Sequence, residues 1–356
     1  MCQVLFSTTQ LWYFIFVGMV YVYYGVMKLP KGVWRLFALL PLIAFYIYMP
    51  LKLATVFERG FVSFLFTWLT TFKLLLLCWD AGPAADPWAF STFPRFLTVI
   101  SLSLQLKTKS ASQARAAGGS GAHQGIKQIQ DRNHQPSLWH IVLLRLFLKF
   151  LFLALLSSIY TFRIQLPGWL IYMMYSFHIY VSCSLVFDGL ATIVSAAMAI
   201  ELEPAYNKPF LSSSLTDFWG KRWNLLISNL MRTAVYEPRF SQVPLWPRTL
   251  ALLSCFVVSG LMHELLFVYI SLSWPTGEVT AFFTLHGILA ALEVFIRRRF
   301  RLKFTKLVSI PITLCFLFFS SIWLFYPALF RAGTEEQAMA EFQHFFCKLL
   351  PENGCS

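Results

Sequence analysis

The chain has 356 residues, of which 58% are hydrophobic and 13% are charged, and its formal net charge is +13. This composition excludes an ordinary soluble domain, in which about a quarter of the residues are charged. The 37 Phe and 12 Trp residues are typical of a protein whose surface meets lipid and whose helix ends lie at the membrane interface. We therefore expect a membrane protein.

Apolar segments long enough to cross a bilayer follow one another along the chain, separated by Pro, Gly and charged residues. We predict an all-α fold, a polytopic bundle of eight or nine transmembrane helices with additional interfacial helices. The fifth segment is long enough for one tilted helix or for two short passes broken near Asp188. The predicted segments are 11–27, 33–51, 61–79, 138–160, 168–199, 248–272, 279–296 and 307–330.

Most of the Lys and Arg residues outside these segments lie in alternate gaps. Because cytoplasmic loops carry the excess of positive charge, both termini are expected in the lumen. Cations at a membrane surface are attracted to anionic lipid headgroups and also attract an anionic substrate, so the net charge does not call for a nucleic-acid partner. The gaps expected in the cytosol are 28–32, 80–137, 201–247 and 297–306.

The gap 80–137 contains two stretches that are not expected to span the membrane. Residues 107–135 are rich in Ser, Gly, Ala and Gln and are predicted to be a disordered cytosolic linker within a single membrane-embedded domain, 1–356. Residues 96–106 are too short to span and are expected at the interface or packed on the bundle. The seven cysteines form no CxxC pair, so no metal site is predicted.

Ionisable residues inside a span are costly, by about 2.5–3.5 kcal/mol each at the bilayer centre. Lys149 lies near the cytosolic end of a span, and its side chain is expected to snorkel towards water. Glu293 precedes Arg297 by one helical turn and is expected to pair with it. Lys73 and Asp188 are expected to make polar contacts within the bundle rather than to catalyse.

His263 stands among apolar residues in "SCFVVSGLMHELLFVYISL", with Ser259 and Gly260 about one turn before it. These small residues allow another helix or a ligand chain to approach the imidazole. A zinc protease is excluded because Phe267 stands where the HExxH motif needs its second histidine. Glu264 points about 100° away on a helix. Two interpretations remain for the histidine, an interhelical hydrogen bond and a neutral general base.

The segment 201–247 contains no spanning run, yet it is too aromatic for a solvated loop. Ser214 with Asp217 three residues later approximates a capping box. From Asp217 to about Val235, apolar and aromatic residues recur at helical spacing. We therefore predict one amphipathic helix that lies in the cytosolic interface or re-enters it.

The polar residues of this helix allow two interpretations. In one, its cations snorkel from a membrane-surface helix. In the other, the cations meet an anionic ligand, Trp219 and Trp223 form the wall of its entrance, and Asn224 is directed into the bundle. The cations concerned are Lys221, Arg222 and Arg232.

Two motifs taken together, "PFLSSSLTDFWGKRWN" (209–224) and "FVVSGLMHELLF" (256–267), resemble the signature pair of the membrane-bound O-acyltransferase superfamily. More narrowly, they resemble its plant wax synthase branch, the long-chain-alcohol O-fatty-acyltransferases. "WRLFALLPLIAFYIYMPL" and "TWLTTFKLLLLCWDAGP" are similar to the same branch. The chain departs from it at Lys221, where arginine is common, and at Thr216, where glutamine is frequent.

The resemblance implies that His263 is the catalytic histidine and Asn224 the second motif residue. It also implies a bundle with a central tunnel, acyl-CoA as donor and a location in the endoplasmic reticulum membrane. The chemistry needs no cofactor, because a thioester is already activated, but the acceptor hydroxyl must lose its proton to a base. Asn224 could donate to the thioester oxygen or orient the base, and both roles stay open.

The acceptor expected first is a long-chain fatty alcohol, which would give a wax ester. A sterol or a diacylglycerol is the alternative acceptor within the same reaction class. A different class, a transporter, would use intramembrane polar residues as an ion path, although no internal repeat supports it. An inactive scaffold is the third alternative. The residues that could line an ion path are Lys73, His178, Asp188 and His286.

Overall fold

The chain forms two compact units, one made of residues 1–103 and 206–356 and the other of residues 104–205. The predicted linker, 107–135, lies outside the described residues, and the expectation of a single domain over 1–356 stays a prediction. The computed structural model describes residues 6–82, 87–102, 139–160, 165–198, 200, 202–236, 245–300 and 305–349.

Each predicted apolar segment is a helix, and within the described ranges eight helical segments are long and apolar enough to cross a membrane. The fifth, α10, runs without interruption from Gly168 to Met198, so the alternative of two short passes is wrong. Its 31 residues extend about 46 Å. The segments are Thr8–Lys28, Val33–Lys52, Val56–Leu77, Trp139–Tyr160, Gly168–Met198, Arg248–Ser271, Glu278–Arg297 and Lys306–Leu329.

The first unit begins with three spanning segments that share a core. They comprise α1 (Thr8–Tyr24), α2 (Val33–Tyr48) and a continuous run of α3 (Val56–Val62), η3 (Ser63–Thr70) and α4 (Thr71–Leu77). Large apolar side chains that are fully buried fill the space between these helices, as expected where one face of each helix turns away from lipid. The largest of them include Met19, Leu39, Tyr46, Phe66 and Trp68.

The short helix α6 (Phe93–Ser101) packs against this core through Phe96 and Ile100, so residues of the predicted 96–106 segment pack on the bundle. Lys73, which is buried, donates hydrogen bonds to the carbonyl oxygens of Val99 (2.7 Å) and Leu102 (2.6 Å) at the end of α6. A cation at a helix C-terminus is favourable because unpaired carbonyls lie there. The predicted structural role of Lys73 is confirmed.

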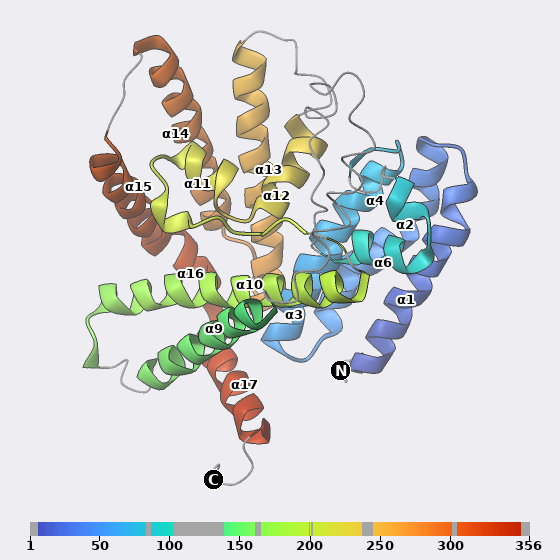
Figure 1. The fold of residues 1–356 in the computed structure, drawn as a ribbon, viewed down its shortest axis with the longest axis horizontal. Helices are drawn as coiled ribbons and strands as arrows, with labels where there is room; N and C mark the ends of the chain where they lie inside the picture. The colour runs from blue at the N-terminus through green and yellow to red at the C-terminus, as the bar shows by residue number, and fades with distance from the viewer. Residues whose placement is uncertain are drawn as a thin grey trace. The chain divides into compact units, whose positions relative to one another are not determined.

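Two long helices later in this unit, α13 (Leu245–Ser271) and α14 (Glu278–Phe300), lie side by side (Figure 1). A Cβ atom added to Gly260 would lie 3.0 Å from the Cα of Thr280, and one added to Gly287 would lie 2.7 Å from the Cβ of Phe256. The small residue before His263 therefore admits a neighbouring helix, as predicted.

Glu264 makes its hydrogen bonds in the turn between these two helices. Its carboxylate accepts hydrogen bonds from the backbone N–H groups of Thr276 (2.8 Å), Gly277 (2.8 Å) and Thr280 (3.1 Å), so it caps the start of α14. It does not pair with His263, in agreement with the sequence spacing.

The unit closes with α15 (Lys306–Ser320), η9 (Ser321–Phe325), α16 (Tyr326–Leu329) and α17 (Thr334–Leu349). Large apolar side chains along α15 and η9 are exposed on the protein, which is what contact with lipid requires. Three of them are Leu307, Ile312 and Trp323.

In the second unit, α9 (Trp139–Tyr160) packs along α10. Lys149 forms an ion pair with Asp188 and donates a hydrogen bond to the hydroxyl of Ser184 at 2.7 Å. Lys149 therefore does not snorkel, because a carboxylate on the neighbouring helix offers it a stronger partner than the membrane surface. Asp188 makes the bundle contact that was predicted for it.

The predicted single helix from Asp217 to Val235 is wrong. The segment forms α11 (Leu215–Lys221), α12 (Leu225–Met231) and η8 (Arg232–Tyr236). The chain breaks because Asn224 adopts a left-handed backbone conformation (φ 39°, ψ 66°), which Asn tolerates better than most residues. Local hydrogen bonds of neighbouring side chains override the apolar periodicity here.

Candidate functional site

A cavity of about 380 Å³ lies in the first unit between α11, α12, α13 and α14. On α13 its wall includes Arg248, Leu252, Ser259 and His263, which recur along one side of the helix. Fifteen residues of helix separate the first from the last, so the cavity extends about 22 Å along α13. In the predicted topology, the Arg248 end faces the cytosol and the His263 end lies within the membrane.

Within the part of the chain that the structure describes, one ring nitrogen of His263 is left for chemistry. Its Nδ1 lies 2.7 Å from the carbonyl oxygen of Ser259, one turn earlier on α13. A carbonyl only accepts, so Nδ1 carries the proton and Nε2 of the neutral ring keeps its lone pair. The ring stacks on Phe283 (4.3 Å between centroids) and meets Trp68 edge-on (4.8 Å). Its hydrogen bond stays within its own helix, unlike the interhelical one considered from the sequence.

Asn224 lines the same cavity as His263. It is the N-cap of α12, where its Oδ1 accepts a hydrogen bond from the backbone N–H of Ile227 at 3.3 Å. This bond turns the oxygen of the amide towards the helix, so the two hydrogens of Nδ2 are the groups left to donate to a ligand. The break in the predicted helix is thus what gives Asn224 its orientation.

Trp219 and Trp223 also line the cavity. Trp223 stacks on Phe218, with 5.3 Å between ring centroids and 18° between ring planes. Trp219 donates a hydrogen bond from Nε1 to Nδ1 of His286 on α14, at 3.1 Å. Both indoles are therefore held by protein partners as part of the wall.

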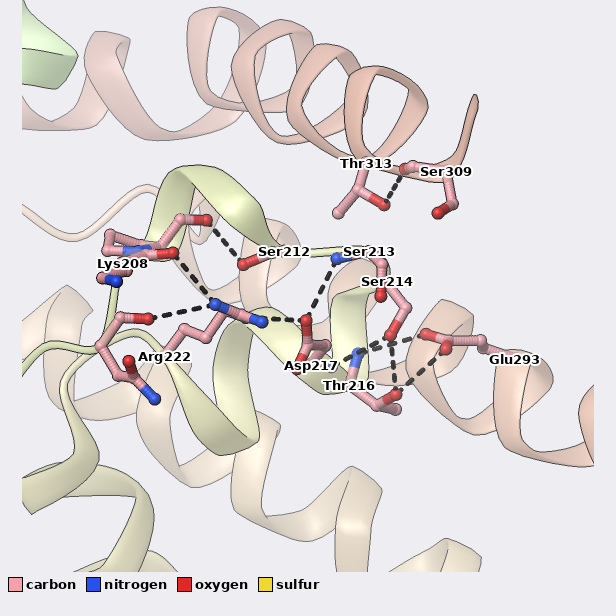
Figure 2. A network of polar contacts seen from close by, with 12 residues as sticks. Lys208, Ser212, Ser213, Ser214, Thr216, Asp217, Arg222, Glu293, Ser309 and Thr313 are labelled. Atoms are coloured by element: carbon pink, nitrogen blue, oxygen red, sulfur yellow. Dashed lines mark hydrogen bonds and ion pairs between the residues drawn. The ribbon is translucent and has the colours of Figure 1, made fainter. Parts of the chain in front are cut away.

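The cations predicted on the motif segment separate into two groups. Arg222 pairs with Asp217 (Nε to Oδ2, 2.8 Å) and its Nη1 lies 3.3 Å from the carbonyl oxygen of Lys208, as Figure 2 shows. Neither Arg222 nor the exposed Lys221 lines the cavity, and their role in substrate binding stays a prediction. Arg232 does line it.

The start of α11 is anchored on both sides. Ser214 Oγ accepts from the backbone N–H of Asp217 at 3.0 Å and so caps the helix, whereas the Asp217 carboxylate accepts from the N–H of Ser213 at 3.1 Å. The carboxylate of Glu293 on α14 accepts from the backbone N–H (3.1 Å) and hydroxyl (3.0 Å) of Thr216 (Figure 2). Glu293 also pairs with Arg297 at 2.9 Å, as predicted.

Asp217 should make the stability of this segment depend on pH. Burial alone would raise the pKa of its carboxyl, but the hydrogen bonds from Arg222 and Ser213 and the charges of Arg222 and Lys221 outweigh it and hold the pKa below its usual value. A lowered folded-state pKa stabilises the fold at neutral pH, and this contribution is lost as pH falls through the folded pKa.

We expect Asp217→Asn to lower the free energy of unfolding by about 1–3 kcal/mol at pH 7. The difference from wild type should be constant above about pH 5 and shrink below about pH 4. Thermal unfolding of purified protein in detergent between pH 3 and pH 7 measures this. A difference that does not change with pH would contradict the role of the charge.

Residues 202–285, which include Asn224 and His263, match the membrane bound O-acyl transferase family. Over almost the whole chain the sequence is also similar to an acyl-CoA-sterol O-acyltransferase 1 of Arabidopsis thaliana, with 30% identity over 342 residues that cover 94% of each chain. The chain belongs to the membrane-bound O-acyltransferase family. Membership in this family sets the transporter alternative aside.

Two further relatives of this O-acyltransferase carry a different acceptor in their names. The long-chain-alcohol O-fatty-acyltransferase of Simmondsia chinensis is 31% identical over 322 residues, which cover 88% of this chain and 87% of the relative. A probable long-chain-alcohol O-fatty-acyltransferase 1 of Arabidopsis thaliana is 32% identical over 340 residues, 93% of each chain.

Sequence reasoning missed some residues of the O-acyltransferase cavity. Arg248 is the first residue of a predicted span beside a cytosolic gap, and that position could have marked it as a cation at the mouth. Trp68 and Phe283 come from spans with nothing in their patterns to distinguish them from other apolar wall residues. Within the described ranges, no group of three or more His, Cys, Asp and Glu side chains is arranged to hold a metal ion.

Proposed function

We propose that this O-acyltransferase transfers a fatty acyl group from acyl-CoA to the hydroxyl of a long-chain alcohol, in the endoplasmic reticulum membrane. The observation that carries the proposal is the presence of His263 and Asn224 on the wall of one cavity, with a free lone pair on the first and free donor hydrogens on the second. The two relatives named as long-chain-alcohol acyltransferases support the acceptor.

His263 would act as the general base. As the hydroxyl oxygen of the alcohol attacks the thioester carbonyl carbon, Nε2 takes the hydroxyl proton. The hydrogen bond from Nδ1 to the carbonyl of Ser259 stabilises the imidazolium that forms. When the tetrahedral intermediate collapses, the carbon–sulfur bond breaks and Nε2 returns the proton to the CoA thiolate. The products are an ester and free CoA, and the imidazole is again neutral.

Asn224 would stabilise the oxygen of the thioester. Negative charge develops on this oxygen as the intermediate forms, and a donor already oriented towards it lowers the barrier without reorganisation. The capping bond to the N–H of Ile227 supplies that orientation. A site within the apolar part of the bundle also limits the access of water, which would otherwise hydrolyse the thioester.

Arg232 and Arg248 would hold the phosphates of CoA. Both line the cavity, and in the predicted topology Arg248 lies at its cytosolic end. Guanidinium groups form charge-assisted, often bidentate, hydrogen bonds with phosphate. We expect the double variant Arg232→Ala/Arg248→Ala to raise KM for acyl-CoA about 10-fold or more, because hydrogen bonds to charged groups contribute about 1.5–3 kcal/mol each. Initial rates in membranes at varied acyl-CoA concentration measure this.

The matched control is Arg95→Ala, which removes a cation that contacts Ser91 and Trp88 and does not line the cavity. Its KM should stay within about 2-fold of wild type. A variant that combines Lys221→Ala with Arg222→Ala separates the two groups of cations. If that variant raises KM and the Arg232 and Arg248 variant does not, the phosphates bind at the outer face of α11 instead.

A sterol is the second candidate acceptor, because one relative at 30% identity is named as an acyl-CoA-sterol acyltransferase. Membranes containing the expressed protein should be given labelled acyl-CoA with fatty alcohols, sterols or diacylglycerol in separate reactions. We expect labelled ester from fatty alcohols. If labelled ester forms with sterol alone, the acceptor is a sterol and not a fatty alcohol. If no labelled ester forms with any acceptor, the proposal is contradicted.

A further inference from the structure

His286 is a buried polar residue that the proposed chemistry does not use. It lies on α14, its exposed fraction is 0%, and both ring nitrogens have partners. Nδ1 accepts the hydrogen bond from Trp219 Nε1, and Nε2 lies 2.9 Å from the hydroxyl of Ser320. An indole N–H only donates, so Nδ1 carries no proton and Nε2 donates to Ser320.

The hydroxyl of Ser320 completes this arrangement, because it donates in turn to the carbonyl oxygen of Phe316 at 2.7 Å. The hydrogens that Trp219, His286 and Ser320 donate in these bonds therefore all have acceptors. Both ring nitrogens of the neutral His286 are engaged, so neither is left for a substrate. An apolar side chain could fill the same space at lower cost in a membrane protein. A histidine at this position is therefore expected to contribute through its hydrogen bond to Trp219.

From Trp219 the hydrogen bonds continue to Asn224. The carbonyl oxygen of Trp219 accepts from the hydroxyl of Ser228 on α12, and the backbone N–H of Ser228 donates to the carbonyl oxygen of Asn224 at 3.1 Å. A contiguous set of bonds thus joins α14 to the residue that caps α12.

The same helix also contacts the base. Phe283, one turn before His286, stacks on the ring of His263, and Glu293 holds the start of α11 through Thr216. These three residues of α14 lie on one side of the helix, at positions i, i+3 and i+10. α14 therefore contacts both His263 and the segment that carries Asn224, although it contributes neither residue.

We propose that His286 is a positioning residue, which holds Asn224 opposite His263 through Trp219 and Ser228. This inference rests on the proposed function, in which His263 is the base and Asn224 the donor. A displacement of about 1 Å in a catalytic group can lower a rate by about 100-fold. Loss of the His286 bond should therefore lower kcat and leave the KM for acyl-CoA nearly unchanged, because Arg232 and Arg248 stay in place.

Two substitutions at position 286 test this in purified protein, with activity expressed per folded molecule. His286→Leu removes the acceptor for Trp219 and should lower kcat about 10- to 100-fold, with KM for acyl-CoA within about 3-fold of wild type. His286→Asn keeps a side-chain oxygen as acceptor and should recover at least about half of the loss in log kcat. The lack of any recovery, or a matching rise in KM, would overturn the positioning role.

Trp219→Phe removes the donor of the same hydrogen bond. It provides a second test if a variant at position 286 fails to fold. The double variant Trp219→Phe/His286→Leu should be no slower than the slower single variant, because both remove the same bond. If the losses in kcat of the two single variants multiply in the double variant, the inference is overturned. Thr284→Val is the matched control, since its hydroxyl bonds to the Thr280 carbonyl within α14, and its kcat should stay within about 2-fold of wild type.

His263→Ala separates this inference from the proposed function. If His263→Ala abolishes ester formation and His286→Leu retains full kcat, the positioning role is wrong and the proposed function stands. If His263→Ala retains full activity, the proposed function itself fails. The expected pattern is a loss in kcat of about 100-fold or more in the first variant and a smaller loss, recovered by asparagine, at position 286.

Discussion

Replacing His263 with alanine is expected to lower kcat about 100- to 10,000-fold, the range that general base catalysis supplies. The alcohol hydroxyl is too weak an acid to lose its proton unaided, and Nε2 of His263, on the wall of the cavity that Asn224 also lines, has a lone pair that can accept it. KM for acyl-CoA should change little, because the proposed phosphate contacts, Arg232 and Arg248, are separate side chains that the substitution leaves in place. Ester formation from labelled acyl-CoA at saturating alcohol measures kcat.

The control for packing is His263→Gln, since the imidazole lies between Phe283 and Trp68 and alanine leaves a space there. Glutamine fills much of that space and can donate to the carbonyl of Ser259, but its amide is a negligible base at neutral pH. Its kcat should fall as far as that of the alanine variant. A glutamine variant with wild-type kcat would show that position 263 is needed for structure and not for proton transfer.

Replacing Asn224 with alanine is expected to lower kcat about 100- to 1,000-fold, as the removal of a donor to a developing oxyanion does. The same change should also cost about 1 kcal/mol of stability, because Asn224 caps α12. Activity and thermal unfolding of the purified variant measure the two effects separately.

Asn224→Asp separates catalysis from capping. Aspartate caps helices as well as asparagine does and also tolerates the left-handed backbone, so the stability should stay within about 0.5 kcal/mol of wild type. The carboxylate has no N–H to donate, so kcat should fall at least as far as in the alanine variant. An aspartate variant with normal kcat would mean that Asn224 acts only as a cap.

Hydropathy predicted the membrane-spanning segments well because each must satisfy its backbone hydrogen bonds within itself, so its length and composition are local properties. The same reasoning left the fifth segment ambiguous, since Asp188 and Gly189 inside an apolar run are typical of a break. The ion pair of Asp188 with Lys149 on α9 removes that ambiguity. The partner comes from another helix, so no local pattern could predict it.

The motif segment shows where periodicity fails. Phe218, Leu226 and Leu230 recur as in one helix, but the chain ends α11 at Lys221 and starts α12 at Leu225. The bonds of Arg222 to Asp217 and to the carbonyl of Lys208 compete with continued helix, and Asn224 accepts the left-handed turn. Side-chain bonds to the backbone are stronger local determinants here than an apolar stripe.

Composition, hydropathy and the two motifs identified the class of protein and the spanning segments, and they singled out His263 and Asn224. The tertiary structure was needed to show which cations line the cavity. Arg222 pairs with Asp217, whereas Arg232 and Arg248 line the cavity wall. The link from His286 to Trp219 likewise joins residues 67 positions apart. Burial and hydropathy act on each segment alone, whereas the orientation of a donor or base depends on partners that only packing brings together.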